Sequence, residues 1–80
     1  MFIHHYENTR HRQPNELKYV AAFESYPKNE IDIRRWCYQA YGAAGLDVNN
    51  FYVRWIDHIK YGEIEFALEE DLTLFLLRWS

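Results

Sequence analysis

The sequence predicts an α+β fold, a two-layer sandwich in which an antiparallel sheet of three to four strands has two helices on one face. Two observations carry this prediction. Several segments alternate apolar and polar residues with the period of a strand, and two others repeat apolar residues with the period of a helix. A chain of 80 residues, 49% of them hydrophobic, has room for one core. We therefore expect residues 1–80 to form a single domain.

Two strands are expected in the N-terminal third of the chain. Residues 17–25 alternate, and Pro27 ends the run; the more apolar side carries Leu17, Tyr19, Ala21 and Phe23. Residues 2–6 are expected to form a shorter strand, and residues 8–16 form the loop that joins it to the strand over residues 17–25.

The first helix is expected to start after Asn29, a favourable N-cap that precedes the acidic Glu30 and Asp32. Gly42 or Gly45 ends it. Apolar residues at spacings of three and four form a single stripe that faces the core: Ile33, Trp36, Cys37, Ala40, Tyr41 and Ala44.

A hairpin and a second helix complete the chain. A strand from Phe51 to Ile59 or Lys60 is followed by a turn at Tyr61-Gly62 and by a second alternating strand over residues 63–68. Three acids, Glu69, Glu70 and Asp71, suit the first turn of the last helix. Its core stripe is Leu72, Phe75, Leu76 and Trp79, whereas Leu74 and Leu77 project away from that stripe.

The order of elements is therefore ββαββα. If the first short strand pairs antiparallel with the second, the elements rebuild a ferredoxin-like sandwich whose last strand has moved to the front of the chain. Without that first strand, the sheet has three strands and the two-layer α+β class is unchanged.

Composition excludes several classes of protein. The chain has a net charge of −3 and so lacks the clustered positive charge expected of a protein that binds duplex nucleic acid. The single cysteine, Cys37, cannot form an internal disulfide, which favours a cytoplasmic location. The first residues predict no signal peptide, and no apolar window approaches the roughly 18 residues of a membrane span, so we expect no membrane association.

Nothing in the sequence predicts an enzyme, a cofactor or a small-molecule substrate. The histidines are His4, His5, His11 and His58, and their spacing favours surface residues over metal ligands. Cys37 lies on the apolar stripe of the first helix, which predicts an inert core thiol with a raised pKa. The three glycines are scattered, so no phosphate-binding loop is present.

Nucleic-acid binding is a weaker alternative. An open sheet face can stack bases on aromatic side chains, and the candidate contacts are Arg10, Arg12, Tyr52 and Arg54. The negative net charge argues against this function.

The more distinctive signal is surplus apolar surface, which predicts a protein interface. The candidate interface residues are Leu74, Leu77, Arg78 and Tyr6. We expect a homodimer formed through the last helix, since twofold contacts are the commonest. The alternative is that residues 2–6 fold over this helix and cover it.

The C-terminal run resembles the ending of small tailed-bacteriophage proteins of unknown function. In these proteins a strand leads into Glu-x-Asp and then Phe-x-Leu-x-Trp, positions occupied here by Glu69, Asp71, Phe75, Leu77 and Trp79. The resemblance implies a viral α+β module, and proteins of this kind are commonly accessory factors that bind a host protein. The alternative is a structural or assembly component of the virion. It implies no catalytic residues.

Overall fold

A computed structural model describes residues 3–7, 17–44 and 54–80 and confirms the element order ββαββα. The elements are β1 (Ile3–Glu7), β2 (Tyr19–Phe23), α1 (Glu30–Tyr41), β3 (Trp55–His58), β4 (Glu63–Phe66) and α2 (Glu69–Trp79), with a short 3-10 turn at Ile59–Tyr61 between β3 and β4. Among these residues no helix is long and apolar enough to cross a bilayer.

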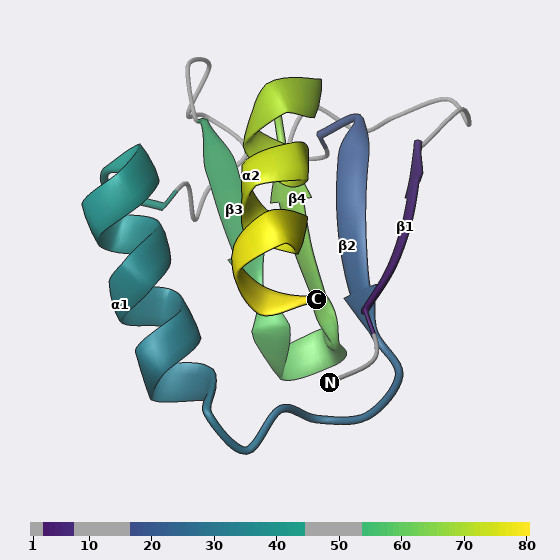
Figure 1. The fold of residues 1–80 in the computed structure, drawn as a ribbon, viewed down its shortest axis with the longest axis vertical. Helices are drawn as coiled ribbons and strands as arrows, with labels where there is room; N and C mark the ends of the chain where they lie inside the picture. Colours follow the sequence, from purple (N-terminus) through teal and green to yellow (C-terminus); the bar gives the residue numbers. More distant parts are fainter. Residues whose placement is uncertain (1–2, 8–16, 45–53) are drawn as a thin grey trace.

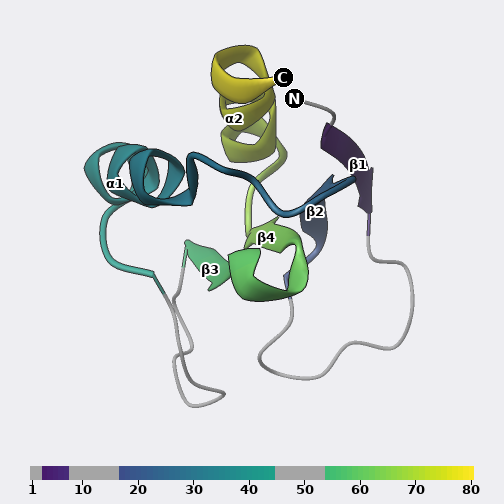
Figure 2. The same cartoon turned by 90° about the horizontal axis from the view of Figure 1, so that it is seen from below.

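The four strands form one antiparallel sheet in the order β1-β2-β4-β3. Both helices cover the same face: α2 stands over the centre of the sheet and α1 lies on the β3 side (Figures 1 and 2). This strand order is that of a ferredoxin-like sandwich whose last strand has moved to the front, because β1 pairs with β2 at the edge of the sheet. The predicted fold class is confirmed.

The core lies between the sheet and the helices. Alternate residues of each strand point toward the helices, and Ala21, Trp55, Ile64 and Phe66 are fully buried there. The Phe66 ring lies 5.4 Å from the ring of Phe75 in α2 and 5.4 Å from that of Tyr41 in α1, so one side chain joins the sheet to both helices.

Helix α1 begins and ends where the sequence predicts. The carbonyl of Asn29 accepts the first helical hydrogen bond, from Ile33 N at 3.0 Å, although the Asn29 side chain makes no capping bond. Gly42 ends the helix with a positive φ of 85°. Arg34 ties the exposed side of α1 to Asp57 of β3 through a 2.7 Å ion pair.

Strand β3 is shorter than expected. The strand predicted to continue to Ile59 or Lys60 ends at His58, because the chain turns into the 3-10 segment. The Asp57 carboxylate accepts a hydrogen bond from Ile59 N at 3.1 Å, which stabilises that turn, and Gly62 completes it with a φ of 83°. The predicted start of this strand, at residues 51–53, lies outside the described residues.

Candidate functional site

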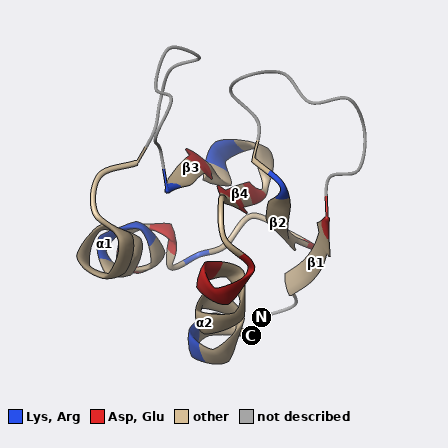
Figure 3. Ribbon diagram, turned by 90° about the horizontal axis from the view of Figure 1, so that it is seen from above, with Lys and Arg blue, Asp and Glu red and all other residues tan. Residues whose placement is uncertain are grey.

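The outer face of α2 carries an exposed stripe, formed by Glu70, Leu74, Leu77 and Arg78. At about 100° per residue these four positions fall on one side of the helix, opposite the buried Leu72 and Phe75. Leu74 is 46% and Leu77 is 78% exposed, as the sequence predicts. Acids occupy the first turn of α2, and Arg78 gives the other end a positive charge (Figure 3). We call these four residues the α2 stripe.

Strand β1 does not cover this stripe. It pairs with β2 at the sheet edge, and both leucines remain exposed. The sequence also placed Tyr6 in the interface, but the structure does not bring Tyr6 to the two leucines. Its hydroxyl donates a 2.7 Å hydrogen bond to Glu63 on β4, and the strand register places both side chains on the face opposite the buried Ile64 and Phe66.

A groove of about 320 Å³ lies between the first two strands and α2. Leu72, Leu76 and Tyr19 give it an apolar floor, and His5, Glu69 and Thr73 are among its polar lining. This volume is at the lower end of the roughly 300–1,000 Å³ typical of small-molecule sites.

The candidate nucleic-acid residues are not brought together in the described part of the chain. Arg54 is held by Asp71, with its Nε 2.7 Å from Oδ2, and its guanidinium lies over the Tyr41 ring. Arg10, Arg12 and Tyr52 lie outside the described residues. The helix-free face carries Glu63 and Glu65 on its central strand β4, and these carboxylates repel phosphate.

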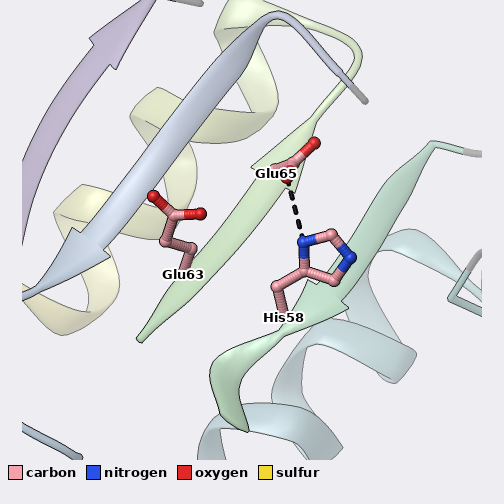
Figure 4. A group of neighbouring side chains, drawn as sticks. All are labelled: His58, Glu63 and Glu65. Carbon is pink, nitrogen blue, oxygen red and sulfur yellow. Dashed lines mark ion pairs between the residues drawn. The ribbon is translucent and has the colours of Figure 1, made fainter. Parts of the chain in front are cut away.

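His58, Glu63 and Glu65 form a polar cluster on the helix-free face of the β3–β4 hairpin (Figure 4). His58 Nδ1 lies 3.0 Å from Glu65 Oε2, and one ligand atom from each of the three side chains lies within 4.8 Å of the others. Only 5% of Glu65 is exposed. The backbone N–H of Leu17 donates to its other oxygen at 2.7 Å.

The cluster changes the interpretation of one histidine. His58 was expected to be a surface residue, but its side chain is only partly exposed and is paired with a buried carboxylate. Histidine and cysteine spacing does not reveal the cluster, because two of its three side chains are carboxylates. The signal that could have found it is the hairpin register, in which His58 faces Glu63 across the strands.

Cys37 is a buried core thiol, as predicted. Burial raises its pKa to about 12, and the nearby negative charge of Asp57 acts in the same direction. The thiolate is therefore unavailable as a nucleophile near neutral pH.

Comparison with known proteins gives no family assignment. The chain matches no family model, and no curated protein or solved structure is significantly similar to it.

Proposed function

We propose that this protein is a non-enzymatic protein-binding module that pairs with a second copy of itself through the α2 stripe. The observation that carries the proposal is the exposure of Leu74 and Leu77, side by side, on a helix whose opposite side is fully used by the core. Exposed apolar side chains clustered on one face are typical of protein interfaces.

The charges of the stripe favour a second copy of this chain as the partner. Glu70 and Arg78 lie four residues before and four residues after Leu74. When two α2 helices pack antiparallel about a twofold axis at Leu74, Glu70 of one protomer faces Arg78 of its partner. The stripe is therefore self-complementary in both apolar contact and charge, as an isologous interface requires. Antiparallel packing also places opposite helix dipole ends side by side.

A phage origin extends this proposal. The resemblance of the C-terminal run to tailed-bacteriophage proteins supports an accessory role in the cytoplasm of an infected cell. In that role the dimer binds a host protein through surfaces that self-pairing leaves free. Co-purification with virions would instead indicate a component of the particle.

The solution mass measured by light scattering across a dilution series tests the proposal. We expect a mass of twice 9.8 kDa at the higher concentrations, falling toward 9.8 kDa on dilution. The double variant Leu74→Ser/Leu77→Ser should be a monomer with an unchanged circular dichroism spectrum. As a matched control, Ile31→Ser removes a side chain of similar size that is exposed on α1 and should leave the mass unchanged.

Charge reversal tests the antiparallel arrangement. Glu70→Arg and Arg78→Glu should each weaken the dimer, because each places like charges across the axis, and the double reversal should restore it. A wild-type protein that stays monomeric at every concentration would refute self-pairing. A dimer that survives the double leucine variant would refute the α2 stripe as the interface.

A further inference from the structure

The β3–β4 hairpin places three metal-ligating side chains on one face. His58 is the direct cross-strand partner of Glu63, and Glu65 lies two residues further along β4. Side chains of directly paired residues, and of residues two apart on one strand, point to the same face of a sheet. The cluster is therefore fixed by backbone register, and its ligand atoms lie within 4.8 Å of one another.

The spacing between His58 and Glu65 suits an ion. Nδ1 and Oε2 lie 3.0 Å apart. A metal ion with bonds of about 2.0–2.2 Å to nitrogen and oxygen holds neighbouring ligands roughly 3 Å apart. An ion can therefore lie between these two atoms with little movement of either side chain. Glu63 is partly exposed, and a movement of its side chain brings a carboxylate oxygen to the ion as the third ligand.

Hydrogen bonds from outside the cluster orient both carboxylates. Leu17 N donates to Glu65 Oε1 at 2.7 Å, and the Tyr6 hydroxyl donates to Glu63 Oε2 at 2.7 Å. The His58 and Tyr61 rings pack perpendicular to each other, with centroids 6.4 Å apart. Ligands of metal sites are held by such outer contacts, which reduce the cost of ordering them. The two carboxylates also balance the charge of a divalent ion.

We propose that His58, Glu63 and Glu65 bind a divalent transition-metal ion of the Zn²⁺ type. Imidazole nitrogen favours Zn²⁺ and its neighbours in the transition series, whereas Mg²⁺ and Ca²⁺ prefer all-oxygen sites. Three protein ligands leave a fourth position for water. This site is independent of the α2 stripe, which lies on the other side of the sheet.

Isothermal titration of the full chain with ZnCl₂ tests the site. We expect one Zn²⁺ per chain and no measurable heat from MgCl₂ or CaCl₂. Glu63→Gln and His58→Ala should each weaken Zn²⁺ binding by at least about tenfold, because losing even an outer partner of a metal ligand typically costs that much. Glu63→Gln keeps an oxygen that can accept from Tyr6, so it removes ligand charge with little change to the fold. The matched control is His4→Ala/His5→Ala on β1, which should bind Zn²⁺ with wild-type affinity.

A second measurement separates binding from folding. Zn²⁺ should raise the melting temperature of the wild type and of the β1 control, because an ion that binds only the folded chain stabilises it. At the same Zn²⁺ concentration it should raise that of Glu63→Gln by less, because the variant binds the ion more weakly. The proposal is overturned if Zn²⁺ does not bind, if Glu63→Gln binds it as tightly as the wild type, or if the β1 control loses binding.

Discussion

Arg54 and Asp71 form a two-point ion pair that fixes the start of α2 against the start of β3. Nε of Arg54 lies 2.7 Å from Oδ2 of Asp71, and Nη2 lies 2.9 Å from Oδ1. A backbone hydrogen bond lies beside this pair, because Ala67 N, just after β4, donates to the Arg54 carbonyl at 3.0 Å. Asp71 is only 3% exposed, so its carboxylate depends on the arginine for charge compensation.

Replacing Arg54 by glutamine should therefore destabilise the fold. The change leaves the Asp71 carboxylate buried without its cation, and we expect the free energy of unfolding to fall by about 2 kcal/mol. This figure is below that of a fully buried pair because half of the arginine side chain is exposed. Urea unfolding at pH 7 measures the change. Arg35→Gln, on the exposed side of α1, is the control and should cost less than about 0.5 kcal/mol. Equal costs for both variants would show that the pair contributes nothing.

The secondary structure was largely predictable because local patterns determine it. The stripe that begins at Ile33 and the alternation in residues 17–25 each depend on neighbours a few residues away. Exposure of Leu74 and Leu77 followed from the same helical geometry. The end of β3 at His58 could not be predicted from a local pattern, because it depends on a hydrogen bond from Ile59 N to the Asp57 carboxylate.

The polar contacts could not be predicted from the sequence because they depend on how distant elements meet. The acids that start α2 were explained by the helix dipole, yet Asp71 is also the buried partner of Arg54. His58 and Glu65 meet only when the register of the hairpin is known. A shift of one residue in that register would turn His58 and Glu65 to opposite faces of the sheet.

The raised pKa of the Cys37 thiol makes stability depend on pH in the alkaline range. Burial raises its pKa to about 12, whereas the unfolded thiol loses its proton near pH 8.5. Above pH 8.5 the folded state therefore holds more protons than the unfolded state, so the free energy of unfolding must fall as pH rises. It should fall by about 1 kcal/mol between pH 8 and pH 9.5 because of this group alone.

Urea unfolding of the wild type and of Cys37→Ala over this pH range isolates the effect of the thiol. Other titrating groups affect both proteins equally and cancel in the difference. The wild type should lose its advantage over the variant as pH rises. Parallel pH profiles for the two proteins would show that the thiol titrates normally in the folded state.

The two glycines with positive φ should respond differently to substitution. Gly62, at φ 83° and ψ 18°, occupies the left-handed helical region, which asparagine tolerates. Gly42, at φ 85° and ψ −161°, occupies a region that is almost exclusive to glycine. An added Cβ meets no atom within 4 Å at Gly42 and only an ordinary 3.8 Å contact with the Phe23 carbonyl at Gly62. Any loss of stability therefore arises from backbone strain and not from crowding.

Gly62→Ala should cost about 1–2 kcal/mol, and Gly62→Asn should recover part of that loss. Gly42→Ala should cost about 1–3 kcal/mol, and Gly42→Asn should recover none of it, because asparagine does not relieve strain at that ψ. Thermal unfolding of the four variants beside the wild type measures both differences. Recovery by asparagine at both positions would mean that the chain leaves α1 with a left-handed helical residue at Gly42. The backbone at residues 42–44 would then differ from the one observed.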